Sequence, residues 1–266
     1  MAETDIVRFT RVTVKFGSEA ALNAVSWTLQ AGDTCVILGA AGSGKTVLLK
    51  TALGLIHPDE GSVTLFGRDT VGARERDMAE LRSRIGILFQ EGGLFDSLTI
   101  EENVGYPLVN QKSLRCPPEE VRPRVEEALS FVELGHTLEK YPSEISGGMR
   151  RRAGIARAVV TRPQLVLYDS PTAGLDPITA NNIMVLVAKE RDIRRTTTAL
   201  ATHRYQDGHL LANYRYNANT GRLEAGETGT RFLVLKDGCI AFEGSQDELE
   251  ASRDPYVSKF AKPLRD

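Results

Sequence analysis

The sequence of 266 residues is poor in cysteine, in net charge and in long apolar runs. Its three cysteines are odd in number and scattered, which favours a reducing cytosol over a disulfide framework or a metal site. The formal net charge of −2 leaves no electrostatic footprint for nucleic acid, so we expect no nucleic-acid partner. No apolar run approaches the ~20 residues of a membrane-spanning helix, and the acidic N-terminus lacks the layout of a signal peptide.

The rest of the composition is that of an ordinary globular protein. Hydrophobic residues make up 41% and charged residues 26% of the chain, which is typical of this class. The length allows one large α/β domain or two small ones.

A glycine-rich motif organises the chain. Residues 39–46 read GAAGSGKT and fit the pattern G-x-x-x-x-G-K-[ST] of a phosphate-binding loop. The apolar run Thr34–Leu38 predicts a buried strand before the motif, and residues 47–55 predict a helix after it. This strand–loop–helix context favours a phosphate-binding loop over a plain glycine-rich turn, which is the alternative interpretation.

The chemistry expected of this loop follows from its residue types. Glycines let successive backbone N–H groups turn inward around phosphate oxygens, and the helix N-terminus adds a partial positive charge. Lys45 would reach the β- and γ-phosphates, and the Thr46 hydroxyl would hold Mg²⁺. The loop residues expected to contact nucleotide are Gly39, Ala40, Ala41, Gly42, Ser43, Gly44, Lys45 and Thr46.

Two polar side chains stand where further strands are expected to end. Gln90 follows a strand predicted over residues 84–89, where its amide oxygen could coordinate Mg²⁺ or orient water. The alternative for Gln90 is a strand-end residue satisfied by solvent. Asp169 ends the strand predicted at Leu165–Asp169, and an Asp at this place supports Mg²⁺ in phosphate-loop proteins.

Phe16 and His203 are further candidates. Residues 6–29 predict two antiparallel strands joined by a turn that begins at Phe16. An aromatic ring there could stack on adenine, which contributes about 1–3 kcal/mol for bases elsewhere; plain core packing is the alternative. His203 follows a strand predicted over residues 196–202. A lone histidine is more often structural, but a place beside two phosphate-site strands favours a functional role.

Residues 91–160 change from strand alternation to helical periodicity, which predicts a helical subdomain inserted into an α/β core of residues 1–90 and 161–266. Pro123 is expected in the first turn of one helix, and Gly135 is expected to end it. One face of that helix collects five apolar residues, Val121, Val125, Ala128, Leu129 and Val132.

Ser146, Gly147 and Gly148 open another predicted helix. A hydroxyl and two bare backbone amides at a helix N-terminus form a second candidate anion site, although Ser-Gly-Gly is also common in loops. The arginine run at residues 150–152 is most simply a solvated helix face.

Taken together, these motifs resemble those of the nucleotide-binding subunit of ABC transporters along nearly the whole chain. In order they are Phe16, GAAGSGKT at Gly39, Gln90, ISGGM at Ile145, LVLYD at Leu165, AGLD at Ala173 and His203. Each motif alone is a weak or moderate signal, whereas all of them in this order and spacing are very specific.

This resemblance implies an α/β fold of the P-loop NTPase class. It combines a RecA-like core with a small antiparallel β subdomain and an inserted helical subdomain, in a single ABC ATPase domain over residues 1–266. The resemblance also implies ATP and Mg²⁺ as cofactors, with Thr46, Gln90 and Asp169 as metal ligands.

The resemblance further implies a head-to-tail pair of ATPase subunits, expected to be a homodimer. The phosphate-loop side of one subunit would meet Ser146, Gly147 and Gly148 of the other, and His203 would hydrogen-bond the γ-phosphate. Asp176 would lie in the loop linking the two sites. An integral membrane permease would dock a coupling helix near Gln90 and the helical subdomain.

Within that family the chain looks most like the ATPases of Mla and MCE-type lipid transporters. The likeness rests on residues 93–99 with 103–108 (GLFDSLT, NVGYPL), on residues 146–152 (SGGMRRR), and on residues 176–179 with the tail 254–260 (DPIT, DPYVSKF). It implies phospholipid transport, an MCE-type substrate-binding protein as a further partner, and a cytoplasmic, peripheral place on the inner face of the cell membrane. Importers of polar solutes share part of the pattern and are the alternative.

One departure from the family pattern concerns catalysis. Family members usually carry Glu directly after the Mg²⁺-site Asp, whereas this chain has Ser170. A serine hydroxyl is a very poor base at neutral pH, so we expect slow ATP hydrolysis. The other residues expected to act in catalysis are Lys45, Gln90, Asp169 and His203.

A second departure is a stretch of extra residues between His203 and the last hairpin. Strand-like alternation at Tyr214 and Tyr216, with a turn at residues 219–221, predicts an added β-hairpin. We expect it on the surface, away from the phosphates, because loop insertions are tolerated there. The final hairpin is expected to turn at residues 237–238.

Two other classes of function stay open at this point. Cytosolic ABC-type proteins that act on ribosomes or DNA usually carry two ATPase units or long coiled coils, and this chain shows neither. A nucleotide-gated module that hardly hydrolyses ATP is the third hypothesis, and Ser170 supports it.

Overall fold

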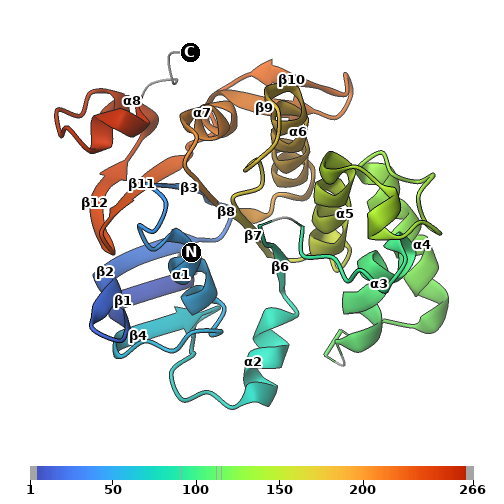
Figure 1. The fold of residues 1–266 in the computed structure, drawn as a ribbon, viewed down its shortest axis with the longest axis horizontal. Helices are drawn as coiled ribbons and strands as arrows, with labels where there is room; N and C mark the ends of the chain where they lie inside the picture. Colours follow the sequence, from blue (N-terminus) through green and yellow to red (C-terminus); the bar gives the residue numbers. More distant parts are fainter. Residues whose placement is uncertain (1–4, 91, 112, 115, 262–266) are drawn as a thin grey trace.

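The structure, a computed structural model, describes residues 5–90, 92–111, 113–114 and 116–261. In this part of the chain the strands form three sheets, with the orders β2-β1-β4-β5, β12-β11-β3-β8-β7-β6 and β10-β9. The six-stranded sheet lies at the centre, with the β1–β2–β4 sheet on one side and α3, α4 and α5 on the other (Figure 1).

The strands are β1 (Asp5–Phe16), β2 (Glu19–Gln30), β3 (Thr34–Leu38), β4 (Glu60–Leu65), β5 (Arg68–Asp69), β6 (Ile85–Leu88), β7 (Leu165–Asp169), β8 (Thr197–Thr202), β9 (Tyr214–Asn217), β10 (Arg222–Ala225), β11 (Arg231–Lys236) and β12 (Cys239–Gly244). The α-helices are α1 (Lys45–Ala52), α2 (Glu75–Arg82), α3 (Ile100–Asn110), α4 (Pro118–Phe131), α5 (Gly147–Val159), α6 (Pro177–Arg194), α7 (Tyr205–Asn213) and α8 (Gln246–Glu250). Two short 3₁₀ helices are η1 (Pro142–Glu144) and η2 (Val257–Phe260).

The central sheet is covered on both faces. Every residue of β3, β7 and β8 is buried, as expected for parallel strands packed between other elements. Alternate residues of β3 enter different cores. Cys35 and Ile37 pack in the core that also contains α1 and the antiparallel sheet, whereas Val36 and Leu38 pack in the core that contains the helices. One set of strands therefore holds both cores together.

Several expected elements are confirmed. The predicted strands at residues 34–38 and 165–169 form β3 and β7 with the expected bounds, and the antiparallel pair within residues 6–29 forms β1 and β2. α1 is shorter than expected, because it ends at Ala52 rather than at residue 55. The physical reason is Gly54, whose φ of +64° turns the chain out of the helix while the apolar sequence continues.

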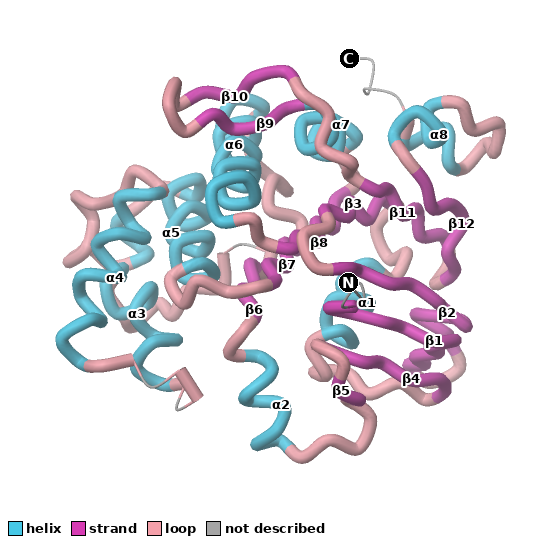
Figure 2. The backbone as a smooth tube through the Cα atoms, turned by 180° about the vertical axis from the view of Figure 1, so that it is seen from behind, coloured by secondary structure: helices cyan, strands magenta, loops and turns pink. Residues whose placement is uncertain are grey.

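α3, α4 and α5 lie side by side beyond β6 in both views (Figures 1 and 2). The apolar face expected on α4 is buried except at Val121, which is partly buried. The expected ends of that helix are wrong, because α4 begins at Pro118 and ends at Phe131. Pro118 takes the first helical position, where a missing N–H costs nothing, so Pro123 lies in the second turn. The division into a helical subdomain at residues 91–160 stays a prediction. No helix of the described residues is both long enough and apolar enough to cross a membrane.

The extra residues after His203 form the expected β-hairpin. β9 and β10 pair antiparallel, and the final hairpin of β11 and β12 turns at residues 237–238. The added hairpin is fixed to the C-terminal end of α6, since Asp192 Oδ2 accepts the Tyr216 N–H at 2.6 Å and Arg191 Nη2 donates to Tyr214 O at 2.7 Å. It therefore packs at the opposite end of α6 from the loop that follows β7.

The core near β7 contains a carboxyl group without a hydrogen bond. Glu190 of α6 is fully buried, and neither carboxylate oxygen has a hydrogen-bond partner among the described residues. Arg194 Nε lies 3.4 Å from Glu190 Oε2 as an ion pair. Burial raises the pKa of Glu190 to about 7, and the charge of Arg194 offsets only part of that rise.

Glu190→Gln is expected to stabilise the protein above neutral pH relative to the wild type. The folded-state pKa of about 7 lies above the ordinary value of 4.5, so the fold binds this proton more tightly than the unfolded chain does. The stability from Glu190 is therefore present below pH 4.5 and is lost as the pH rises through 7. The difference corresponds to about 3 kcal/mol, which the glutamine variant does not lose.

Urea unfolding of both proteins at about pH 5 and about pH 8 measures this difference. Glu127→Gln is the control, because it removes another carboxylate beside Arg194, one that is half exposed. Parallel pH profiles of the wild type and Glu190→Gln would contradict the prediction.

Candidate nucleotide site

The candidate residues on the phosphate side lie at one edge of the central sheet. β3, β8, β7 and β6 are parallel neighbours, and adjacent strands end within one residue of each other in the register. Each strand ends at or just before a candidate residue. In the same order, these are Gly39, His203, Asp169 and Gln90. Parallel strands present their carboxyl ends on the same edge, which is where α/β sheets bind ligands. Residues far apart in the sequence are thereby brought together.

The phosphate loop is packed tightly at two glycines. Gly39 has φ +154°, and a Cβ atom there would lie 2.4 Å from Ser43 Oγ and 2.5 Å from Leu235 O. Gly44 has φ +102°, and a Cβ atom there would lie 2.5 Å from Ala21 O. The loop is therefore pressed against β11 and β2, and α1 starts directly after it at Lys45. This tight cradle at a helix N-terminus fits a polyphosphate.

Lys45 is buried over the loop. Its Nζ donates to Gly39 O and Ala40 O at 2.8 Å each, and it lies 3.5 Å from Ser43 Oγ. Burial lowers the pKa of Lys45, and the negative charge of Asp169 opposes this change. The ammonium group is thus largely removed from water and held by neutral oxygens, which phosphate oxygens would replace.

The oxygen donors at this edge fit Mg²⁺. Thr46 supplies a hydroxyl, Gln90 an amide and Asp169 a carboxylate, and all three are hard oxygen ligands of the kind that Mg²⁺ prefers. Asp169 is buried, and its Oδ1 accepts a hydrogen bond from Ser170 Oγ at 3.3 Å. The described residues gather no cluster of three or more His, Cys, Asp or Glu. One carboxylate with neutral oxygens leaves positions for phosphate oxygens and water, as is usual for Mg²⁺.

Gln90, His203 and Phe16 are exposed. The Phe16 side chain is 57% exposed at the end of β1, so the alternative of plain core packing is wrong for this ring. Exposed side chains around a loop of this kind are available to a ligand. Their contacts with nucleotide stay proposals.

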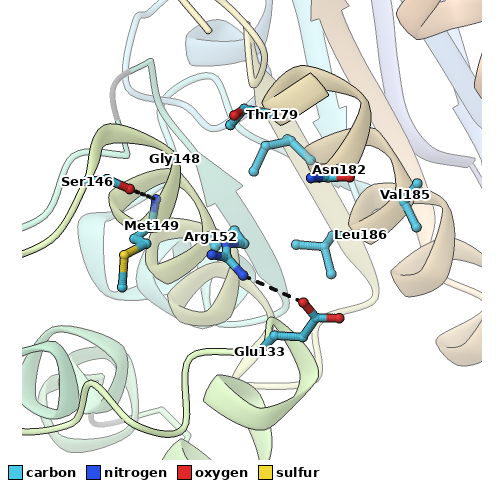
Figure 3. Close-up of a pocket in the computed structure, with 10 residues that line it drawn as sticks. Glu133, Ser146, Gly148, Met149, Arg152, Thr179, Asn182, Val185 and Leu186 are labelled. Atoms are coloured by element: carbon cyan, nitrogen blue, oxygen red, sulfur yellow. Dashed lines mark hydrogen bonds and ion pairs between the residues drawn. The ribbon is translucent and has the colours of Figure 1, made fainter. Parts of the chain in front are cut away.

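Ser146, Gly147 and Gly148 form the N-terminus of α5, where Ser146 Oγ accepts the Met149 N–H at 3.3 Å. This segment lines two cavities, and neither is lined by a described residue of the phosphate loop. Figure 3 shows the first cavity, between α5 and α6, with Arg152 and Glu133 paired at one side. The phosphate loop is therefore not part of either cavity, although Gln90 lines the second cavity together with Gly147.

The arginine run after this segment is not a solvated face, so that expectation is wrong. Arg151 is only 4% exposed. The guanidinium groups donate to main-chain carbonyls, Arg150 to Ile145, Arg151 to Ala173 and Arg152 to Val132. Arginine carries many donors in a rigid fork, so one side chain can fasten a loop. Here Arg151 ties the start of α5 to the loop after β7, and Arg152 ties it to the residue that follows α4.

The sequence reasoning missed a buried carboxyl group behind the site. Asp207 of α7 is 2% exposed, and its Oδ2 accepts hydrogen bonds from Thr172 Oγ1 at 2.6 Å and Thr202 Oγ1 at 2.7 Å. Burial raises the pKa of Asp207, while the two hydroxyl donors lower it. Asp207 thereby links the loop that carries Ser170 to the strand end that precedes His203. The available signal was an acidic residue one helical turn after His203.

The chain is similar to many curated proteins. A family model described as ABC transporter matches residues 22–173. The chain is 34% identical over 254 residues to the probable ribonucleotide transport ATP-binding protein Mkl of Mycobacterium tuberculosis, covering 96% of this chain and 66% of the relative. It is 36% identical over 234 residues to the methionine import ATP-binding protein MetN of Leifsonia xyli, covering 87% and 67%. It is 35% identical over 259 residues to the sulfate/thiosulfate import ATP-binding protein CysA of Synechococcus elongatus, covering 97% and 68%. The chain thus spans just under two thirds of the length of Mkl.

Solved structures show the same fold. The dimeric structure of MJ0796, a bacterial ABC transporter cassette, has a TM-score of 0.74 and 31% identity, and the match covers 90% of this chain and 98% of that one. The cassette cbiO1 of Clostridium perfringens, part of the transporter complex cbiONQ, has a TM-score of 0.77 and 26% identity, with 95% and 93% covered. The expected fold class, a P-loop NTPase cassette of mixed α/β structure, is confirmed.

Proposed function

Because the chain belongs to the ABC transporter family, as an ATP-binding domain, we propose that it is the ATPase subunit of a transporter that moves lipid through a membrane permease. The observation that carries ATP binding is the parallel register that gathers the phosphate loop, Gln90, Asp169 and His203 at one sheet edge. ATP and Mg²⁺ are the cofactors of this family, and the cradle and oxygen donors at this edge fit both.

Two subunits would close head to tail, so that each nucleotide lies between the phosphate loop of one and Ser146, Gly147 and Gly148 of the other. The dimeric structure of MJ0796 supports this arrangement, because it is 31% identical to this chain. So do the two cavities beside Ser146, Gly147 and Gly148, because no described residue of the phosphate loop lines them. We propose a homodimer, since one chain carries both halves of the site.

Within the site, each side chain has one task. Lys45 brings a positive charge to the polyphosphate, the loop amides orient it, and His203 hydrogen-bonds the γ-phosphate. When bound, Mg²⁺ would supply positive charge beside the β- and γ-phosphate oxygens. Thr46, Gln90 and Asp169 would hold the ion, and Phe16 would stack on the adenine. Because Ser170 takes the place of the usual carboxylate, hydrolysis would be slow.

Lipid is proposed as the cargo because three stretches of the chain resemble MCE-type ATPases. The names of the curated relatives point to other cargoes, since Mkl is named for ribonucleotide, MetN for methionine and CysA for sulfate or thiosulfate. Import of a polar solute is therefore the second candidate. The permease that the chain binds distinguishes the two.

One of the MCE-like stretches forms an aromatic groove suited to a permease helix. The rings of Phe95 and Tyr106 lie 4.7 Å apart, and both are at least 40% exposed. The Arg157 guanidinium lies over the Phe95 ring at 5.7 Å and donates to Gly92 O at 3.0 Å. A cavity of about 350 Å³ lies between these groups and β6. A coupling helix docked here would lie close to Gln90 and so would sense the nucleotide.

Val109→Asp is expected to release the chain from its permease. Val109 is 67% exposed beside Tyr106, on a second hollow along α3. Docking an apolar helix there would strip water from the new carboxylate, which costs several kcal/mol. Val71→Asp is the matched control, because Val71 is also an exposed valine but follows β5. Retained co-purification of Val109→Asp, or equal loss in both variants, would contradict this docking surface.

The identity of the permease tests the cargo. Pull-down from gently solubilised membranes is expected to recover an integral permease of an MCE-type lipid system, its MCE-type substrate-binding protein, and this chain as a peripheral protein on the cytoplasmic face. ATPase activity of that complex should respond to phospholipid. Recovery of a sugar or amino-acid permease instead would overturn lipid transport and leave the ATPase role intact.

A further inference from the structure

The tail at residues 254–260 touches the phosphate loop. The Ala40 N–H donates to Tyr256 Oη at 3.2 Å, and Tyr256 Oη donates to Leu235 O at 3.0 Å. The first of these bonds joins residues 216 positions apart. Leu235 O is also the carbonyl that a Cβ atom on Gly39 would strike. The tyrosine hydroxyl therefore sits where β11 meets the first residues of the loop.

We propose that Tyr256 is a positioning residue for nucleotide binding, which fixes the start of the phosphate loop from outside. The proposal rests on nucleotide binding by that loop. The main chain of Ala40 is held at both ends, because its carbonyl accepts the Ser43 N–H at 3.2 Å and a hydrogen bond from Lys45 Nζ at 2.8 Å. Lys45 is the group expected to turn toward the phosphates. When Lys45 leaves Ala40 O to contact the phosphates, the hydrogen bond from the Ala40 N–H to Tyr256 would remain and would still hold the loop.

The tail holds the Tyr256 ring in place before the hydroxyl meets the loop. Asp254 Oδ1 accepts the Tyr256 N–H at 2.7 Å and the Val257 N–H at 3.0 Å, and these backbone hydrogen bonds hold the pKa of Asp254 below its ordinary value. The Phe260 ring packs edge-on at 5.2 Å, and Lys236 Nζ lies 5.3 Å from the Tyr256 ring centre. Val257 itself is buried in the core of helices. A ring held from several sides loses little freedom in making this hydrogen bond.

A contact that holds the phosphate loop affects nucleotide binding because the loop is rich in glycine. Gly39, Gly42 and Gly44 all have positive φ, a region that glycine reaches easily and also leaves easily. A contact that orders such a loop before the ligand arrives lowers the ordering cost of binding. Loss of one neutral hydrogen bond is expected to weaken nucleotide binding about 2- to 12-fold.

Tyr256→Phe tests the proposal, because it deletes the hydroxyl alone. Titration of the full-length chain with Mg-ADP and with a non-hydrolysable Mg-ATP analogue should show about 2- to 12-fold weaker binding of both. Tyr214→Phe is the control, since it deletes an exposed hydroxyl on the added hairpin and should leave affinity unchanged. In the assembled transporter the KM for ATP should rise with kcat unchanged, which partial unfolding would not produce.

Hydrogen exchange provides a second measurement on the same protein. The Ala40 amide should exchange faster in Tyr256→Phe than in the wild type, while the β3 amides stay protected. Unchanged affinity with unchanged exchange at Ala40 would overturn the proposal, as would an equal loss of affinity in Tyr214→Phe. The affinity of the wild type tests whether the loop binds nucleotide. The ratio of the variant's affinity to that of the wild type tests the role of Tyr256, so either proposal can be contradicted without the other.

Discussion

Replacing Ser170 by Glu is expected to raise the ATP turnover of the assembled transporter by about 10²–10⁴-fold. This factor is the usual contribution of a positioned general base. In the family, the carboxylate at this position accepts a proton from the attacking water or orients it. A serine hydroxyl can hydrogen-bond the water but takes up its proton very poorly at neutral pH. Charge stabilisation by Lys45, Mg²⁺, His203 and the opposite Ser146 would remain, so the wild type should retain some turnover.

The structure provides a place for the new carboxylate. Ser170 has φ +51°, and its N–H donates to Ala201 O at 2.8 Å, so β8 fixes the backbone from which the side chain departs. The short Ser170 side chain donates its hydroxyl hydrogen bond to the neighbouring Asp169 Oδ1 at 3.3 Å. A glutamate on the same backbone reaches two carbon atoms further. We therefore expect the substitution to add the missing carboxylate while the hydrogen bond to β8 holds the backbone in place.

We expect that Asp176 does not replace the missing base. It caps α6, where its Oδ1 accepts the N–H groups of Ile178 at 3.1 Å and Thr179 at 3.0 Å. Hydrogen bonds from the Thr179 hydroxyl and backbone hold the pKa of Asp176 below its ordinary value. A carboxylate engaged in this way is a weaker base than a free one.

Ser170→Gln is the matched control for Ser170→Glu, because it adds the same length without the charge. Turnover should rise with Glu and stay low with Gln. ATP binding should be intact in all three proteins, and the wild-type ATP dimer should be long-lived in size-exclusion chromatography. If Ser170→Glu turns over no faster than the wild type, the absent carboxylate was not the limitation.

Replacing Lys45 by Ala is expected to weaken Mg-ATP binding by about 10²–10⁴-fold. Each hydrogen bond between a charged pair contributes about 1.5–3 kcal/mol, and Lys45 is expected to make one to the β- and one to the γ-phosphate. The variant also loses two bonds to the loop, at Gly39 O and Ala40 O, so the loop should be less ordered as well. An equilibrium titration of the isolated chain measures the change.

Lys50→Ala controls for the loss of a lysine from the same helix. Lys50 lies in the last turn of α1, outside the loop, so its removal should leave affinity nearly unchanged. Lys45→Arg keeps the charge but not the compact ammonium, and it should fall between the wild type and Lys45→Ala. Equal affinities of the wild type and Lys45→Ala would refute the role of Lys45.

Elements whose signals are local could be predicted from the sequence. The strands that end at Leu38 and Asp169 were predicted to the residue, because a short apolar run stops there at a glycine or a charge. Helix ends were less predictable. Apolar residues continue beyond Ala52, and only the positive φ of Gly54 ends α1. Pro123 looked like a first-turn proline, but Pro118 takes that position in α4.

Contacts between distant segments could not be predicted from these patterns. Arg151 looks like any surface arginine until Ala173 is brought beside it, and its partner is a backbone carbonyl that carries no sequence signal. The same holds for Asp207, whose two hydroxyl partners come from a loop and a strand end. The motif residues therefore predicted where the site lies, whereas Arg151 and Asp207, which hold its loops in place, could not be recognised from the sequence.

The bond between Ala40 and Tyr256 also orders events during synthesis. The loop leaves the ribosome 216 residues before its tyrosine, and translation at about 5–20 residues per second makes this delay about 10–40 s. β3 also lacks both of its partner strands at this stage, because β8 and β11 are synthesised later. The nascent chain therefore carries an incomplete phosphate loop among cellular nucleotides until Tyr256 has left the ribosome. Deletion of residues 254–260 would leave every motif in place but would remove the hydrogen bond that completes the loop.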